Sequence, residues 1–248
     1  MHSIFGTKHL LILAGCLLVI ILGVWYARKL PLATLCKRML PIGVVSEVIK
    51  VFYYILANEE THGGILPKSD LPFHLCSLQI LFFLIVVCVE NPKIKELLLS
   101  FMMPSCLCGG VAALLIATTS SLNGGWIISL QYFGYHCAIA IFGITLLTTN
   151  QMKLTLRNLM LCLKFLLAIF LVSIYINSML YDGTFSPNFM YVASPPQTGL
   201  PYLNENHGWL VYIVHYAFLA FVCICACYAY PIIKNAKADR LKAQKAAK

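Results

Sequence analysis

The chain has 248 residues, of which 60% are hydrophobic and 11% are charged. Soluble domains carry roughly 25% charged residues, so this composition excludes a soluble globular protein and favours one that crosses the membrane several times. The net charge of +9 does not indicate nucleic-acid binding, because membrane proteins accumulate basic residues on their cytoplasmic side.

Seven apolar segments follow one another, each close to the roughly 20 residues that a helix needs to cross a bilayer. They cover residues 10–26, 39–57, 71–89, 97–118, 125–147, 158–181 and 208–233. We take the first as a retained helix rather than a signal peptide, because no small-residue cleavage site follows it. Pro104 and the Gly109-Gly110 pair predict a kink in the fourth. The sequence thus predicts an all-α polytopic membrane protein, with a single seven-helix transmembrane domain over residues 1–233.

Lysine and arginine residues are unevenly distributed over the predicted loops. Fourteen of the 18 fall in the first, third and fifth connections and in the basic tail 234–248, whereas Lys8 and Lys68 fall on the other side. Basic loops stay in the cytoplasm, so we predict an outside N-terminus, a cytoplasmic C-terminus and a location in the cell membrane. The tail is interpreted as a solvated topology anchor, with a helix lying against anionic lipid as the alternative.

The outer loop 181–207 is long and carries four prolines, five aromatic residues and little charge. Long loops in compact proteins are often lids or binding loops. We therefore expect this loop to fold back over the outer ends of the helices or to touch the lipid surface.

Polar and ionisable side chains gather in the outer half of the predicted membrane region. They are Glu47, Lys50, His74, Gln79, Gln131, His136, Asn177 and His215. Such residues are costly in hydrocarbon and usually functional. Glu47 and Lys50 are three residues apart, so they share one helix face and can pair. We expect these residues to surround a polar cavity that opens toward the outer leaflet.

The residue types favour general-base chemistry, because a carboxylate tunes the pKa of a nearby histidine. His74 is the candidate base, and His136 and Glu47 would orient it or stabilise charge. Asn177 and Gln131 are candidate oxyanion donors. The remaining candidate substrate-binding residues are His215, Gln79, Lys50 and Cys76. Zinc binding by the histidines is less favoured, because they come from separate helices without ligand-type spacing; no metal or other cofactor is predicted.

The segment Pro72-Phe73-His74-Leu75-Cys76-Ser77-Leu78 resembles the signature of the YwaF-type bacterial integral membrane proteins. Gln131-Tyr132 with His136, Asn177, and Gly208-Trp209 with His215 fit the same pattern. A distantly similar eukaryotic membrane protein is associated with acyl transfer to ether phospholipids, where a cysteine just before the corresponding histidine is implicated. Phe73 stands at that position here. The resemblance therefore implies that Cys76 replaces that cysteine, or that His74 activates water or a lipid hydroxyl directly.

The favoured function is a lipid acyltransferase or hydrolase that works from the outer half of the membrane on membrane lipid. A solute or ion binding or transport protein is the first alternative, although no internal repeat is visible and the inner half looks sealed. A structural membrane subunit, whose polar residues serve helix packing alone, is the second.

Overall fold

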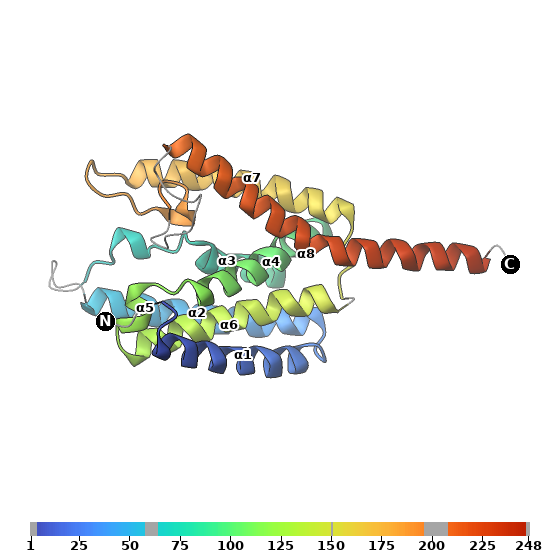
Figure 1. The fold of residues 1–248 in the computed structure, drawn as a ribbon, viewed down its shortest axis with the longest axis horizontal. Coiled ribbons are helices and arrows are strands. Elements are labelled where there is room, and N and C mark those ends of the chain that lie inside the picture. The colour runs from blue at the N-terminus through green and yellow to red at the C-terminus, as the bar shows by residue number, and fades with distance from the viewer. Residues whose placement is uncertain (1–3, 58–63, 150, 196–207, 247–248) are drawn as a thin grey trace.

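The computed structural model describes residues 4–57, 64–149, 151–195 and 208–246, and their regular structure is entirely helical (Figure 1). The helices are α1 (Thr7–Ala27), α2 (Leu32–Ala57), α3 (Leu75–Cys88), α4 (Pro92–Leu115), α5 (Thr119–Asn123), α6 (Trp126–Thr148), α7 (Leu156–Leu180) and α8 (Trp209–Ala246). Two short 3₁₀ turns, η2 (Lys68–Asp70) and η3 (Phe189–Tyr191), lie in the loops. The prediction of an all-α protein with several apolar helices is confirmed.

Within the described residues, six helices are long and apolar enough to cross a membrane: α1, α2, α4, α6, α7 and α8. Helix α3 lies in the third predicted segment but has 14 residues, fewer than the prediction. The residue before a proline is held out of the helical region, and Leu71, which precedes Pro72, is extended. His74 is extended as well, with φ −70° and ψ 151°, so the helix begins only at Leu75.

Helices α4 and α6 form the centre of the bundle, and glycines let them approach closely. A Cβ atom at Gly143 of α6 would lie 2.5 Å from the backbone nitrogen of Leu107. A Cβ atom at Gly110 of α4 would lie 3.0 Å from the backbone oxygen of His136. Small residues at helix interfaces allow such contact in membrane proteins. This crossing fixes the position of α6, which carries two of the candidate site residues.

Helix α4 contains Pro104, one of the positions at which the sequence predicts a kink. A proline has no backbone N–H, so the carbonyl four residues before it loses its helical hydrogen bond. That carbonyl belongs to Ser100, and it accepts a hydrogen bond of 2.8 Å from the Tyr228 hydroxyl of α8. The proline therefore creates an acceptor that ties α8 to the central helix.

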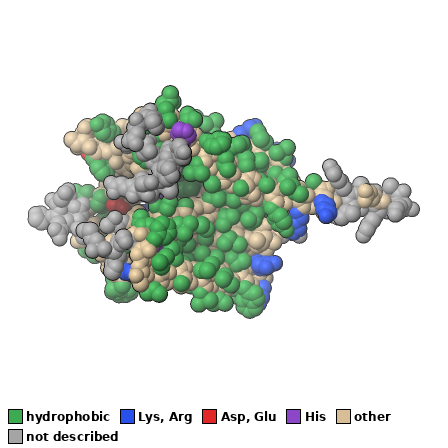
Figure 2. Space-filling model, viewed as in Figure 1, with side chains coloured by type: hydrophobic (Ala, Val, Ile, Leu, Met, Phe, Trp, Pro, Cys, Tyr) green, Lys and Arg blue, Asp and Glu red, His purple; other side chains and the backbone are tan. Residues whose placement is uncertain are grey.

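Helix α8 continues far beyond the bundle, through much of the predicted basic tail, and changes direction where it leaves the bundle (Figure 1). On the face shown in Figure 2, most of the visible lysine and arginine side chains gather near the end of the bundle from which α8 projects. Most of the remaining visible surface is hydrophobic. The bundle thus has one basic end, as well as sides that suit contact with lipid.

Candidate functional site

A cavity of about 410 Å³ lies among α2, α3, α4, α6 and α8, with α5 and η3 contributing to its wall. Its volume falls within the roughly 300–1,000 Å³ of small-molecule sites. The structure brings seven of the sequence-predicted site residues to its lining: Glu47, Lys50, His74, Cys76, Gln79, Gln131 and His136. Asn177 and His215 lie elsewhere.

Glu47, Lys50 and Ser77 form a charged cluster on one wall of this cavity. The Lys50 ammonium lies 2.7 Å from Glu47 Oε1, which confirms the predicted pairing. Ser77 of α3 donates to Glu47 Oε2 at 2.9 Å and accepts from Lys50 Nζ at 3.3 Å. Both charged side chains are mostly withdrawn from solvent, with 20% and 15% of their surface exposed. The cluster ties α2 to α3 and presents opposite charges to the cavity.

His74 lies at the junction between the extended segment and α3. Its Nε2 is 3.2 Å from the Ser69 carbonyl, which can only accept, so the ring carries its proton on Nε2 in this contact. The ring also packs edge-on against Phe189, with centroids 5.1 Å apart, and lies near Tyr191. Among the described residues, no hydrogen-bond partner is found for Nδ1. His74 therefore offers one unprotonated nitrogen while its ring is held by η2 and η3.

His136 shows the same arrangement from α6. Its Nδ1 donates to the Tyr132 carbonyl at 2.7 Å, and its ring lies against the Tyr132 ring with centroids 4.3 Å apart. The side chain is buried at 6% exposure, and the described residues supply no partner for Nε2. Tyr132 is itself fixed by a 2.9 Å hydrogen bond to the Ala113 carbonyl. The cavity is thus lined by a second imidazole with a lone pair to offer.

Two amide side chains complete the polar lining. Gln79 is fully buried and donates to Ser105 Oγ at 2.9 Å, whereas its Oε1 finds no hydrogen-bond partner among the described residues. Gln131 donates to Ser46 Oγ at 2.8 Å. A buried acceptor without a partner is costly, so Gln79 Oε1 is suited to accept a hydrogen bond from a bound molecule.

Asn177 holds the outer loop in place instead of lining the cavity. Its amide makes two hydrogen bonds to the backbone of Phe189, from Nδ2 to the carbonyl at 3.0 Å and to Oδ1 from the N–H at 2.8 Å. Both amide atoms are therefore engaged with the loop, and Asn177 lies outside the cavity lining where an oxyanion donor would be needed. The part of the loop beyond residue 195 that was predicted to cover the helices lies outside the described residues.

The loop that Asn177 holds has an unusual backbone where it reaches the cavity. Asn188, Met190 and Tyr191 have positive φ angles of 53°, 58° and 54°, and the last two line the cavity. Each non-glycine residue in this region costs of order 1–3 kcal/mol and persists only where its surroundings hold it. The Asn188 side chain accepts hydrogen bonds of 3.1 Å from the N–H groups of Ala193 and Ser194. The described loop is therefore a fixed cover.

His215 is exposed on the surface of α8, whereas the next residue, Tyr216, lines the cavity. Successive residues of an α-helix point about 100° apart, so a shift of one position separates an outward side chain from an inward one. The sequence pattern predicts a depth for His215 but not the rotation of its helix.

A protein-family model matches residues 4–228, a range that contains the whole lining of the cavity. The chain belongs to the TMEM164 family. No curated protein and no solved structure gives a significant match. Membership of the TMEM164 family agrees with a multi-pass membrane protein, whereas the YwaF-type likeness rests on the short motifs alone.

Several cavity residues of this TMEM164-family chain were missed from the sequence. They are Tyr54, Asp70, Ser77, Ser105, Ser120, Ser121, Tyr132, Tyr135, Met190, Tyr191 and Tyr216. Ser77 and Tyr132 lie inside the two quoted motifs, so their neighbours could have indicated them. Asp70 of η2 precedes the third apolar segment, and its burial raises the pKa of its carboxyl above the ordinary value. Among the described residues, no three metal-binding side chains are grouped to hold a metal ion.

Proposed function

We propose that this TMEM164-family protein transfers or hydrolyses the acyl chain of a membrane lipid in the cavity. The observation that carries the proposal is the pair of imidazoles, His74 and His136, in the lining of the same cavity. Each ring has one nitrogen fixed by a backbone carbonyl and the other without a partner among the described residues. A neutral imidazole fixed in one tautomer is ready to accept a proton from a nucleophile.

In the proposed reaction, a nucleophile attacks the ester carbonyl of the lipid while His74 takes its proton. The nucleophile is the Cys76 thiol or, without a covalent intermediate, water or a lipid hydroxyl. His74 then returns the proton to the leaving alkoxide as the ester C–O bond breaks. Where Cys76 is the nucleophile, water or a lipid hydroxyl next attacks the thioester and gives its proton to His74, and the departing Cys76 thiolate regains that proton. Lys50 supplies positive charge for the oxyanion, and Glu47 holds Lys50 in place. His136 serves as the second proton carrier at the same cavity.

The proposal includes the membrane topology that gives lipid access to this site. Seven crossings, with α3 and its extended approach as the third, put the N-terminus outside and the basic end with α8 in the cytoplasm. The cavity then lies in the outer half of a cell membrane, below the loop that carries η3. The apolar side chains on the sides of the bundle suit lateral approach of a lipid.

Lipid mass spectrometry tests the proposal. Membranes are compared from cells that lack the protein and from cells that make the intact chain, His74→Gln, His136→Gln or His215→Gln. The exposed His215 is a matched control, because it has the same side chain outside the cavity. We expect a lipid species that follows the intact chain and His215→Gln but is lost by about 10²-fold or more in His74→Gln, as removal of a general base predicts.

Equal lipid profiles with and without the intact protein would overturn the proposal. That result would favour a solute-binding function instead, because the opposite charges of Glu47 and Lys50 in the cavity match a zwitterion. The Cys76→Ala variant separates the two nucleophiles. Loss of activity together with loss of an acyl group bound to the purified protein would indicate the thiol, and retained activity would indicate water or a hydroxyl.

A further inference from the structure

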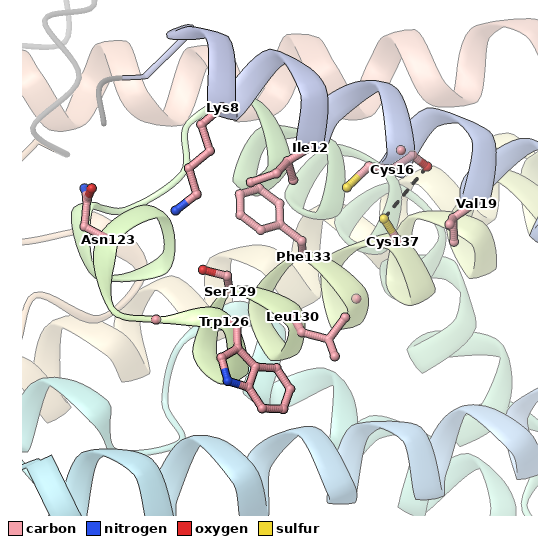
Figure 3. A pocket seen from close by; sticks show the side chains of 13 residues that line it. Lys8, Ile12, Cys16, Val19, Asn123, Trp126, Ser129, Leu130, Phe133 and Cys137 are labelled. Atoms are coloured by element: carbon pink, nitrogen blue, oxygen red, sulfur yellow. Dashed lines mark hydrogen bonds between the residues drawn. The ribbon is translucent and has the colours of Figure 1, made fainter. Parts of the chain in front are cut away.

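A second hollow of about 750 Å³ lies between α1 and α6, separate from the polar cavity (Figure 3). Its lining is mainly apolar and includes Ile12, Val19, Leu130 and Phe133. At one end, the Lys8 side chain of α1 points toward α5 (Figure 3). The hollow therefore combines an apolar groove with a single cationic group.

Glycines on both helices keep this groove open. Nothing lies within 4 Å of a Cβ atom built at Gly15 of α1 or at Gly134 of α6. Other glycines of the bundle, such as Gly143, are in close contact with a neighbouring helix. Gly15 and Gly134 line empty space instead, so their lack of a side chain makes room for something other than this chain.

The Lys8 ammonium has donors to spare. One of them bonds the Leu122 carbonyl at 2.6 Å. Ion pairs between described residues are Lys50 with Glu47, Lys68 with Asp182 and Arg157 with Glu96, and none of them involves Lys8. A lysine at the edge of an apolar groove, with no carboxylate partner in the described part of the chain, complements an anionic headgroup.

The length of the groove fits one leaflet of a bilayer. Lys8 and Val19 are eleven positions apart on α1, which corresponds to roughly 16 Å along the helix axis. One leaflet contributes about half of the roughly 30 Å hydrocarbon core. Trp126, a residue type that favours the membrane interface, lies near the Lys8 end of the groove (Figure 3).

We propose that this groove binds one anionic phospholipid, with an acyl chain between α1 and α6 and the headgroup phosphate on Lys8. This lipid is a bound component of the fold and is distinct from the substrate in the polar cavity. The proposal does not depend on catalysis, so the His74→Gln variant should bind the lipid as the intact protein does.

Quenching of Trp126 fluorescence by brominated lipid tests this site. The full chain is reconstituted in phosphatidylcholine vesicles containing either brominated phosphatidylglycerol or brominated phosphatidylcholine at equal mole fraction. The signal of the Trp126→Phe variant is subtracted to isolate Trp126. Because one lysine near an anionic lipid surface contributes about 1 kcal/mol, we expect binding to brominated phosphatidylglycerol to be about fivefold stronger than to brominated phosphatidylcholine. This preference should weaken at high salt.

Two variants and one control assign the effect. Lys8→Gln should reduce the preference to none, whereas Lys68→Gln, which changes the other outer lysine, should retain it. Gly134→Leu should reduce quenching by both lipids, because the leucine occupies the groove. Equal quenching by the two brominated lipids in the intact protein, or an unchanged preference in Lys8→Gln, would overturn the proposal and indicate ordinary boundary lipid.

Discussion

Glu47 and Lys50 are opposite charges held in a mostly enclosed cavity, so each depends on the other. Removal of one partner leaves a poorly solvated charge, whereas removal of both leaves none. We therefore expect Glu47→Gln and Lys50→Met each to lower the thermal stability of the detergent-solubilised protein. The double variant should lose less stability than the sum of the two single losses. The coupling energy should be about 0.5–3 kcal/mol. Strict additivity would show that the ion pair does not contribute to folding.

Asp182 and Lys68 form an ion pair outside the membrane-spanning helices, with 2.9 Å between Lys68 Nζ and Asp182 Oδ2. The Lys68 hydrogen bond, together with the N–H groups of Phe185 and Thr184, holds the pKa of Asp182 well below its ordinary value of 3.8. A carboxyl whose pKa is lowered on folding stabilises the folded protein at pH values above the ordinary, unfolded-state pKa. This stabilisation is lost as the pH falls from there through the lower pKa of the folded state.

The melting temperature should therefore fall more between pH 5 and pH 3, by roughly a degree or more, in the intact protein than in Asp182→Asn, since the variant lacks the titrating group. Thermal unfolding in detergent across this pH window measures the difference. Parallel curves for the two proteins would contradict an Asp182 contribution. Lys68→Gln should lie between the intact protein and Asp182→Asn, because it removes the main cause of the lowered pKa but leaves the hydrogen bonds from Phe185 and Thr184.

At the scale of residues, depth could be predicted from the sequence but direction could not. Hydropathy and the lysine pattern placed seven candidate residues near one end of the bundle, and they do share a cavity. His215 was predicted to line it, but the next residue, Tyr216, does so instead, because successive residues of a helix point about 100° apart. Asn177 was placed there too, but its amide bonds Phe189, a long-range contact with a loop that no local pattern reveals.

At the scale of elements, the close crossing of α4 and α6 determines where His136 stands. A methyl group at Gly143 would meet the backbone of Leu107, which cannot move aside like a side chain. We expect Gly143→Ala to cost about 1–3 kcal/mol, as overpacking does. Gly134→Ala on the same helix is the matched control, since its Cβ meets nothing within 4 Å. It should be neutral or stabilise the helix by up to about 1 kcal/mol.

Thermal unfolding of the two alanine variants in one detergent measures this difference. Because the crossing positions His136, Gly143→Ala should also reduce the lipid conversion proposed above, whereas Gly134→Ala should leave it unchanged. Equal stability of both variants would mean that α4 and α6 separate easily and do not fix the cavity.

The helices also show which part of the fold the hydropathy pattern does not reveal. Each predicted apolar segment holds a helix, because apolar length decides what can span a bilayer. The helix in the third segment is shortened because Pro72 and the extended His74 precede it. His74 therefore lies just before the first residue of the helix and not inside the helix. A hydropathy pattern averages over many residues and does not register such a change of backbone.

At the scale of the whole molecule, the number of crossings decides on which sides the two ends lie. Helix α3, at 14 residues, is about 21 Å long, less than the roughly 30 Å of a hydrocarbon core. If its extended approach completes the crossing, seven crossings put the ends on opposite sides. If the segment turns back, six crossings put both ends on one side.

Epitope tags at the two ends distinguish these topologies in intact cells. We expect antibody to reach the N-terminal tag without permeabilisation and the C-terminal tag only after it, because the basic end of the bundle and α8 should stay in the cytoplasm. A variant with Lys234 and Lys237 changed to Gln tests the tail's contribution and should keep the orientation, since basic residues near Arg28 and Lys93 remain at the same end. Equal access of antibody to both tags would contradict seven crossings and would make α3 a re-entrant segment, with His74 near its turn.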